Sequence, residues 1–572
     1  MDASKAASMG IATHNEEERV AAALGKLQEV SIQFDSSIEV CKAGVLFAYP
    51  ALISQGLLKA FETYQSLKKG YYGLKQIVVL LAFMALCRIK NPEQLKKCAP
   101  GELGKIMGID RVPEVKTLRK KLKEIFAQGK AVDFSSALTR RWLEEEIETH
   151  FFFYVDGHVR VYSGHQATLT KKYVSRQKLC LAGTTEYWVN NQMGMPYLVV
   201  FAELNEKLKE AIEKQVIPRL LEDTRHLIDH DQLKSDPDLP LFTLIFDREA
   251  YEPKFFKKLW DEHRIAVLTY RKNVQDKWNE KEFKTQQASV IGKIVSMQIC
   301  EKEVSLDNVK MREVRKLGKE GHQTSIITTN KKISTALIAG KMFSRWAQEN
   351  FFRYMIQDYD IDNIIEYGVE EIVPQKSIVN PTYKQLTYQI KKLREKKGRI
   401  EAKLYQIMTE NMDKSIDYLK ASLDKEADLL ESIQWYDADI KQKIEERKNQ
   451  PTHITLEDID QNHRPNKLKT ESKQFINTIK MVAYRAETAL CNLLIPYWST
   501  AEKDIRMLVK EIINSDADIH ADYENKVLTI TLHSLSTPRA NQVVKKLCEL
   551  LNQTQTNYLC TEWKLFYKTL AN

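Results

Sequence analysis

Residues 150–161 read HFFFYVDGHVRV, a strand-forming run that contains a single carboxylate, Asp156. Apolar residues precede Asp156, and the alternating pattern of a β-strand continues beyond it through Val159 and Val161. A carboxylate inside a buried strand costs on the order of several kcal/mol unless a metal ion or another cation compensates it. Asp156 is therefore harder to explain as a simple turn residue than as a functional carboxylate.

Further β-rich runs follow Asp156 and predict a sheet covered by helices. These runs lie at residues 178–190, 196–204, 241–246 and 265–270. The first strands follow one another with short connections, whereas helices predicted at 206–223 and 253–263 separate the later ones. Consecutive strands followed by strand–helix alternation are typical of a mixed sheet with helices on its faces.

The rest of the chain predicts a multidomain α/β protein. A mobile leader ending in a short helix is expected at 1–33, a helical domain at 34–149, the sheet-based core at 150–272 and 341–372, a β-rich insertion at 273–340, a long helical hairpin or coiled coil at 383–448, and an α+β domain at 470–572. The α+β prediction rests on strands at 527–533 and 563–567 with a helix at 538–551 between them.

The composition excludes several classes of protein. The chain has 572 residues, of which 43% are apolar and 28% charged, as in ordinary globular proteins. Its longest apolar run, IVVLLAFMALC at 77–87, is about half as long as a membrane crossing, so no membrane partner is expected. No apolar signal segment opens the chain, and the eight cysteines include no CxxC pair. These features predict a protein of the reducing cytoplasm.

The formal charge of +9 is concentrated in two stretches. Residues 88–123 carry 11 basic and 4 acidic side chains, and residues 384–403 carry 8 and 2. Concentrated positive charge indicates a polyanionic partner such as DNA, because phosphate contacts release condensed counterions. For either stretch alone, lysines that merely solvate an exposed helix face are the simpler explanation.

Within the first basic stretch, residues 102–126 have the layout of a helix-turn-helix. A short helix is followed by a turn near Gly108 and by a second helix that opens close to Pro113. Basic residues of the second helix share one face through i, i+3, i+4 and i+7 spacing: Lys116, Arg119, Lys120 and Lys123. They are candidate DNA contacts, because the second helix of this motif enters the major groove. Plain helical hairpins have much the same pattern.

Two further carboxylates are candidates for a site with Asp156. Asp247 directly follows the predicted strand LFTLIF, although taken alone it is better explained as a turn at a strand end. Glu349 lies in RWAQENFFRYM, with Arg345 and Arg353 one helical turn to either side. This spacing fits a third metal-binding carboxylate and a salt-bridged surface helix equally well. Carboxylates on neighbouring strands bind hard divalent cations, and phosphoryl chemistry commonly uses two such ions about 4 Å apart.

The motifs VDGHVRVYSG, LCLAGTTEYWVN, IFDREAYEP, LTYRKN and RWAQENFFRYM occur in this order, with the β-rich segment before the last. This arrangement resembles the DDE transposases of bacterial insertion sequences, in the branch whose ribonuclease H-like core carries a β-rich insertion before the catalytic Glu. GYYGLKQI, NPEQL, PGELGKIMGIDRVPEVKTLRKKL and IKMVAYRAETAL extend the likeness from about residue 40 to the C-terminal region.

The resemblance implies that Asp156, Asp247 and Glu349 form the catalytic triad and bind two magnesium ions, for which manganese can substitute. It implies cleavage of transposon ends by water and attack of the freed 3′-hydroxyl on target DNA. The implied partners are double-stranded DNA, as terminal inverted repeats and as target, and a second copy of the chain in the synaptic complex. The implied location is the cytoplasm, on nucleoid DNA.

The family's Tyr-Arg-Glu-Lys signature is half present. Arg345 and Glu349 match it, whereas Met342 and Ile356 stand at its Tyr and Lys positions, and Arg353 is a candidate replacement for the Lys. These departures support an alternative function, a domesticated DNA-binding or scaffold protein that has lost its chemistry. A third function is a nuclease with the same core that never joins strands.

Overall fold

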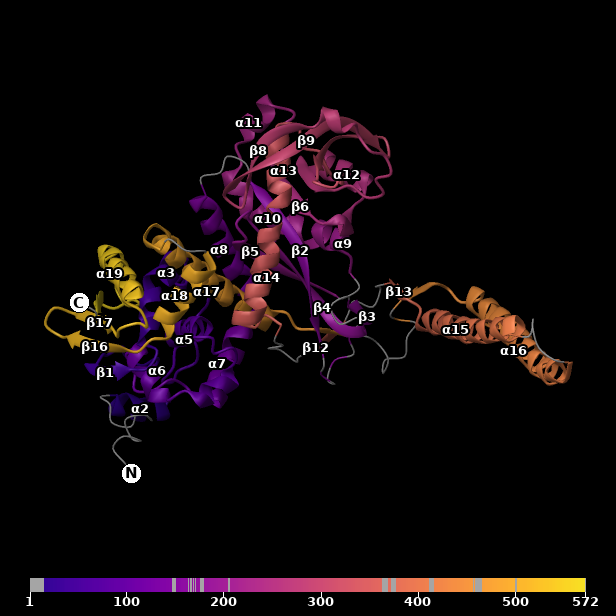
Figure 1. Ribbon diagram of the computed structural model, residues 1–572. Helices are drawn as coiled ribbons and strands as arrows, with labels where there is room; N and C mark the ends of the chain where they lie inside the picture. The colour runs from indigo at the N-terminus through magenta and orange to yellow at the C-terminus, as the bar shows by residue number, and fades with distance from the viewer. Residues whose placement is uncertain are drawn as a thin grey trace. The chain divides into compact units, whose positions relative to one another are not determined.

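The computed structural model describes most of the chain. The described residues are 15–146, 151–162, 164, 167, 169, 171–174, 179–203, 206–362, 369–371, 377–410, 416–455, 457, 466–498 and 502–570. They form two compact units (Figure 1). The larger unit comprises residues 1–163, 170–367 and 469–572, and the smaller comprises 164–169 and 368–468.

A mixed sheet forms the centre of the larger unit. Its first strands are β2 (Phe152–Val161), β3 (Lys171–Val174), β4 (Leu179–Asn190), β5 (Pro196–Glu203), β6 (Phe242–Phe246) and β7 (Ile265–Tyr270). β5 pairs with β4, and the order then runs β4–β2–β6–β7. β4 is antiparallel to β2 and β5, whereas β2, β6 and β7 are parallel. The predicted mixed sheet is thus confirmed.

The β-rich segment that follows β7 extends this sheet. It contains β8 (Lys284–Val290), β9 (Lys293–Leu306), β10 (Val309–Leu317) and β11 (Gln323–Thr328), with a short 3₁₀ turn at Glu280–Glu282. The prediction of β structure here is confirmed, but the strands do not interrupt the sheet. β11 pairs antiparallel with β7, and β10, β9 and β8 follow outward. β11 therefore covers the backbone groups of β7 that an edge strand would leave unpaired.

Helices flank the sheet, and one of them differs from prediction. The flanking elements include α8 (Ala131–Glu145), α9 (Leu208–Ala211), η3 (Ile212–Val216), α10 (Ile217–Thr224), η4 (Arg225–Leu227), α11 (His230–Ser235), η5 (Arg248–Ala250), α12 (Pro253–His263), α13 (Thr335–Phe343) and α14 (Trp346–Tyr359). The helix expected at 206–223 is split by the π-helical turn η3. Pro218 lies just beyond this turn and lacks the N–H that a regular helix needs.

The N-terminal region is largely helical, as predicted, and contributes one unexpected strand. Its elements are α2 (Glu16–Ala23), β1 (Ser37–Val40), η1 (Ala43–Ala48), α3 (Tyr49–Ser54), α4 (Lys59–Thr63), α5 (Leu74–Leu86), η2 (Pro92–Lys97), α6 (Pro100–Met107) and α7 (Val115–Phe126). β1 pairs with β16 (Ala517–Asp522), nearly 480 residues later, in the sheet order β1–β16–β17–β18. Sequence periodicity missed β1 because it has four residues, and it missed β16 because the sequence ADIHAD is rich in polar side chains.

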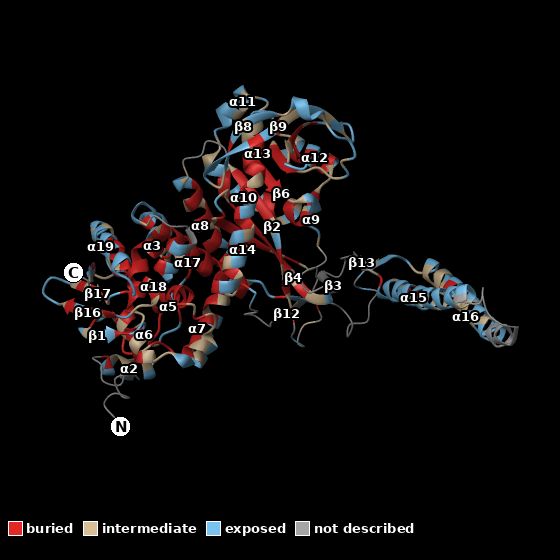
Figure 2. Cartoon of the chain, in the orientation of Figure 1, coloured by how far each residue is buried: buried red, intermediate tan, exposed pale blue. Residues whose placement is uncertain are grey.

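The other C-terminal elements agree closely with prediction. They are α17 (Glu471–Leu494), η10 (Ile495–Tyr497), α18 (Glu502–Asn514), β17 (Val527–Leu532), α19 (Pro538–Gln553) and β18 (Lys564–Thr569). α17 packs against α3, α5, α7, α8 and α18, and it is buried along most of its length (Figure 2). The N-terminal helices and the C-terminal elements therefore share one core.

The predicted leader is attached to the larger unit where the structure describes it. Arg19 of α2 binds Asp110 through two hydrogen bonds, and the backbone N–H of Val30 donates to the Tyr71 carbonyl. Residues 15–33 thus make specific contacts with the larger unit, and mobility of the leader stays a prediction. Residues 1–14 lie outside the described residues.

The smaller unit contains the predicted helical hairpin. α15 (Pro381–Glu410) and α16 (Ile416–Lys448) pack against each other along their length (Figure 1). Short strand pairs accompany them: β13 (Ser377–Val379) with β14 (His453–Thr455), and β12 (Val369–Glu371) with β15 (Asn466–Leu468). The hairpin prediction is confirmed. None of the helices in the described part of the chain is long and apolar enough to cross a membrane.

Candidate active site

Asp156 and Asp247 lie on adjacent parallel strands in matching register. β2 pairs with β6 up to Val155 and Phe246. Asp156 is the next residue of β2, and Asp247 directly follows the end of β6. Side chains at matching positions of parallel strands project from the same face of a sheet. The structure therefore brings together the two carboxylates that the sequence singled out.

Each aspartate is held by a nearby backbone N–H. Asp247 caps η5 by accepting a hydrogen bond of 2.7 Å from the N–H of Arg248. Asp156 accepts one of 2.9 Å from the N–H of Gly157. Burial raises the pKa of Asp156 to about 6, against the lowering effect of Arg345, and the charges of Asp247 and Glu349 raise it further. A bound cation would oppose this rise, because it favours the charged carboxylate.

Glu349 reaches the same site through Arg345. α13 ends at Phe343 and α14 begins at Trp346, so Arg345 stands at the break between the helices. Its guanidinium lies 3.4 Å from Asp156 and 3.4 Å from Glu349. The surface-helix alternative for Glu349 is thus incomplete, because Arg345 joins Glu349 to the carboxylate on β2.

Gln348 holds α14 against the sheet. Its buried side-chain amide donates hydrogen bonds of 3.1 Å to the carbonyls of Tyr154 and Trp188 and to the Asn190 side chain. These acceptors lie on β2 and β4, where Tyr154 pairs with Asn190 and Trp188 pairs with Asp156. Gln348 therefore sets the distance between Glu349 and Asp156.

The donor chemistry of the three carboxylates fits hard divalent cations, which prefer oxygen ligands. In the arrangement described, however, no three His, Cys, Asp or Glu side chains of the described residues are grouped so that they could hold a metal ion. The positively charged Arg345 guanidinium lies between Asp156 and Glu349.

The other signature positions do not join the carboxylates. Arg353 is exposed and makes no hydrogen bond or ion pair within the described part of the chain. Met342 is fully buried in the cluster beneath α13, and Ile356 packs against the main core. Apolar side chains at these two positions therefore serve packing.

The predicted helix-turn-helix contains two helices that pack against different neighbours. α6 packs against β1 and η1, whereas α7 packs against α5, η2 and α17. Lys116, Arg119 and Lys120 are exposed on α7, as the predicted DNA contacts should be. Arg119 forms an ion pair with Glu93. DNA binding by these residues stays a prediction.

The basic stretch 88–123 does not form one positive surface. Arg88 is largely buried and pairs with Asp358 at 3.2 Å and with Glu487 at 2.9 Å. Lys121 is also buried, and it donates a hydrogen bond of 2.8 Å to the Lys68 carbonyl. Counting charge along the sequence therefore overstated the basic surface available to DNA.

Sequence reasoning overlooked three residues of the site. Gln348 precedes Glu349 directly, yet a glutamine carries no charge that draws attention. Tyr270 ends β7 beside β6. Burial raises the pKa of its hydroxyl, Arg345 lowers it, and the charges of Asp247 and Glu349 raise it further. The Arg248 guanidinium lies 5.8 Å from the centre of the Tyr270 ring. Their common signal was position: each lies next to a predicted carboxylate or at the end of an adjacent strand.

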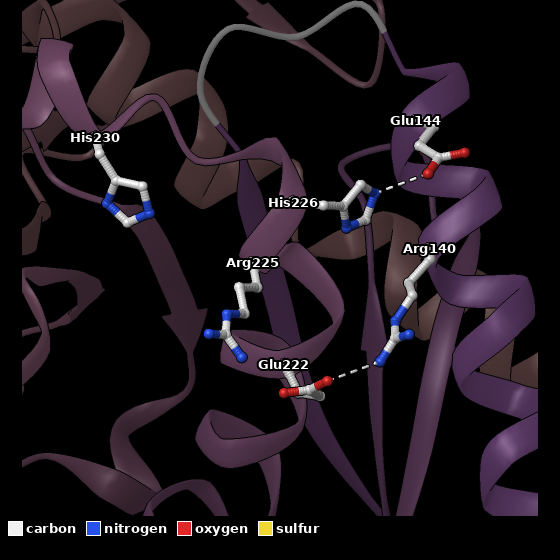
Figure 3. A pocket seen from close by; sticks show the side chains of 6 residues that line it. All are labelled: Arg140, Glu144, Glu222, Arg225, His226 and His230. Carbon is white, nitrogen blue, oxygen red and sulfur yellow. Dashed lines mark hydrogen bonds and ion pairs between the residues drawn. The ribbon is translucent and has the colours of Figure 1, made fainter.

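A charged surface hollow of about 460 Å³ lies elsewhere on the larger unit. Figure 3 shows its lining, which comes from α8 on one side and from the α10–η4–α11 segment on the other: Arg140, Glu144, Glu222, Arg225, His226 and His230. Ion pairs across it join His226 to Glu144 at 2.8 Å and Arg140 to Glu222 at 3.0 Å. It includes none of the predicted site residues, and its charges are of both signs.

Comparison with known proteins places the chain in a family. No curated protein matches it. Among solved structures it is similar to a piggyBac transposase synaptic complex with hairpin DNA, with 9% identity, coverage of 82% of this chain and 76% of that chain, and a TM-score of 0.27. A family model described as "Transposase protein" matches residues 10–571. Because this match spans nearly the whole length, the chain belongs to the transposase protein family.

Proposed function

We propose that the protein is a metal-dependent DNA transposase of the DDE type, with Asp156, Asp247 and Glu349 as its catalytic carboxylates. The observation that carries this proposal is the matching register of Asp156 and Asp247 on parallel strands, with Glu349 joined to Asp156 through Arg345. Membership of the transposase family supports the same function.

The topology of the sheet supports a ribonuclease H-like core. In chain order the five central strands are β2, β4, β5, β6 and β7, and they are arranged in space as β5–β4–β2–β6–β7. The second of them, β4, runs antiparallel to both of its neighbours. The carboxylates lie where the parallel strands β2 and β6 stop pairing, at the edge where open α/β sheets commonly bind ligands.

Asp156, Asp247 and Glu349 would hold two magnesium ions, with manganese as a substitute. When bound, the ions supply charge stabilisation for the attacking and leaving oxygens of an in-line phosphoryl displacement. The chain's own residues position the reaction. Gln348 keeps Glu349 close to Asp156, and Arg345 is placed to contact a phosphate once it leaves the carboxylates.

The proposed reaction has two steps at the transposon ends. Water attacks the scissile phosphodiester and releases a 3′-hydroxyl on the element. That hydroxyl then attacks a phosphodiester of target DNA, forming the new bond and expelling a 3′-hydroxyl of the target. The partners are terminal inverted repeats, target DNA and a second copy of the chain. The proposed setting is a bacterial insertion sequence acting on nucleoid DNA in the cytoplasm.

One observation favours a second function, a DNA-binding protein without catalysis. The Arg345 guanidinium lies 3.4 Å from both Asp156 and Glu349 and offsets part of the negative charge that a metal ion would otherwise balance. The buried Met342 and the partly buried Ile356, at the signature Tyr and Lys positions, agree with a relaxed constraint on catalysis.

The deciding experiment incubates the protein with magnesium and DNA carrying the terminal repeats of its own element. We expect nicking at the repeat ends followed by strand joining. Asp156→Asn, Asp247→Asn and Glu349→Gln should each lower cleavage by about 1000-fold or more, because each removes several kcal/mol of transition-state stabilisation. Asp231→Asn is the matched control, since the Asp231 side chain is 96% exposed.

Three outcomes separate the functions. Cleavage that persists in Asp156→Asn would overturn the triad. Tight binding of the repeats without cleavage by the unaltered protein would establish the DNA-binding function. Cleavage without joined products, traced through a labelled 3′-end, would identify a nuclease.

A further inference from the structure

The hairpin of the smaller unit is a two-helix layer with a defined register. The Lys397 ammonium of α15 lies 2.7 Å from the Asp437 carboxylate of α16. At the base, the Asn380 side chain donates to the Pro451 carbonyl, and β13 pairs with β14. The inner seam contains buried or half-buried residues at heptad spacing: Leu386, Ile390, Leu393, Ile400 and Leu404 on α15, and Leu429, Ile433 and Ile440 on α16.

Large apolar side chains lie outside this seam. Tyr405 and Met408 on α15 are 71% and 55% exposed, and Leu423 and Leu430 on α16 are 61% and 48% exposed. Single exposed apolar residues are ordinary on protein surfaces, whereas a cluster of them marks an interaction site. The four residues therefore indicate an interaction site only if they lie together on one surface of the hairpin.

Helix geometry places the four exposed apolar residues on one surface of the hairpin. The Lys397–Asp437 pair places residue 405 opposite residue 429, so Tyr405 and Met408 lie level with Leu423 and Leu430. At 3.5 residues per turn, Tyr405 and Met408 lie to one side of the α15 seam. Leu423 and Leu430, one heptad apart, lie to the corresponding side of the antiparallel α16 seam. The four side chains thus share one face, which we call the apolar hairpin face.

The two helices differ in charge. α15 carries eight Lys or Arg against three Asp or Glu, a net of +5, and α16 carries six against nine, a net of −3. Lys397–Asp437 is a cross-helix ion pair of the hairpin, while other pairs, such as Lys392–Glu395, lie within one helix. The two helices of one hairpin therefore carry opposite net charges that a second hairpin can complement.

We propose that the apolar hairpin face docks against the same face of a second copy of the chain. A twofold axis parallel to the hairpin places α15 of each copy beside α16 of the other, so that the basic helix meets the acidic one in both contacts. Tyr405 and Met408 then bury against Leu423 and Leu430 of the opposite hairpin, and a four-helix bundle results.

The same face is poorly suited to DNA. Asp424, Asp428 and Glu431 are exposed on α16 beside Leu423 and Leu430, and they would repel phosphates. The basic residues of α15 have an acidic helix as their neighbour, which lowers the local positive potential. A second hairpin would bury the apolar residues and also attract both charged helices. A DNA duplex would attract only the basic helix α15.

This inference rests on the proposed homodimer alone and not on catalysis. It is tested by measuring the oligomeric state of the full-length protein in the absence of DNA by sedimentation equilibrium. We expect a dimer, and Tyr405→Ser combined with Leu430→Ser should raise its Kd by at least about 30-fold, the effect of losing one central contact residue. Asp156→Asn should dimerise like the unaltered protein, so failure of dimerisation and failure of the proposed catalysis are distinguishable.

Two residues provide a matched control. Tyr388 and Trp435 are 60% and 59% exposed but project away from the apolar hairpin face, and Tyr388→Ser with Trp435→Ser should leave Kd unchanged. Circular dichroism at 222 nm verifies that both double variants keep their helices. Raised salt should weaken the dimer, because it screens the attraction between α15 and α16. A monomeric unaltered protein, an unchanged Kd in the face variant, or a loss of DNA binding with the dimer intact would overturn the proposal.

Discussion

Helices α17 and α15 are both rich in charged residues, yet one is buried and the other is exposed. α17 buries Lys473, Lys480, Arg485 and Glu487, whereas α15 is largely exposed and most of its lysines face solvent (Figure 2). α17 is surrounded by helices from both ends of the chain, and α15 packs mainly against α16. The number of neighbouring elements, and not the content of charge, decides whether a helix is buried.

The buried charges of α17 all have specific partners. Glu487 receives hydrogen bonds from Arg88, at 2.9 Å, and from the hydroxyls of Tyr354 and Tyr359. Lys480 donates to the Asp360 carbonyl at 3.0 Å. Since Tyr354 and Tyr359 belong to α14, these contacts also link α17 to the helix that carries Glu349.

Glu487→Ala should cause the largest loss in the free energy of unfolding. It leaves Arg88 buried with Asp358 as its remaining carboxylate partner, and breaking a buried ion pair typically destabilises a protein by about 3–5 kcal/mol. Urea unfolding followed by circular dichroism at 222 nm measures the change across both units. Glu395→Ala on α15 is the control and should stay within about 0.5 kcal/mol. Equal effects would contradict the distinction between the two helices.

Gln348→Leu should give the next effect, about 1–3 kcal/mol, because it leaves the Tyr154 and Trp188 carbonyls without this donor. The exposed Gln385 of α15 is the control, as Gln385→Leu should be nearly neutral. A role in positioning Glu349 adds a second expectation: DNA cleavage falls while affinity for the repeats stays constant. Reduced affinity together with unchanged cleavage would refute that role.

Lys480→Met tests whether the burial of a lysine in α17 makes the stability of the protein depend on pH. Burial lowers the pKa of Lys480 to about 8, while in the unfolded chain it titrates near 10.5. Between these values the unfolded state holds a proton that the folded state has released, so stability should rise with pH. The variant should flatten that rise by up to about 1.4 kcal/mol per pH unit. Urea unfolding between pH 8 and 10 measures the slope, and Lys396→Met on α15 should leave it unchanged.

The smallest effect belongs to α15 itself. Lys392 and Glu395 are 3.0 Å apart at i,i+3 spacing on its exposed surface. A double-mutant cycle with Lys392→Ala and Glu395→Ala should give a coupling of about 0.2–0.5 kcal/mol. It should diminish in high salt, because exposed pairs are screened. A coupling above 2 kcal/mol would mean that α15 is covered in solution.

Much of the site was predictable from sequence, but not how its parts are held. The strand that contains Asp156 and the strand that precedes Asp247 follow from local apolar patterns. The pairing of β2 with β6 does not, because β3, β4 and β5 separate these strands in sequence. Gln348 and the break at Arg345 were not predictable, because both depend on how α14 meets β2. The basic stretch 88–123 was misleading for the same reason: Arg88 and Lys121 find partners elsewhere in the core.

By itself the sequence determined the central strands β2 and β4–β7, the hairpin and the positions of the three candidate carboxylates, since periodicity and spacing are local properties of the chain. Only the tertiary structure decided that β1 pairs with β16, that β11 extends the central sheet, and that the charges of α17 are buried. The physical reason is the distance along the chain between the segments that interact. Pairing and burial depend on segments hundreds of residues apart, and no local pattern records which of them will meet.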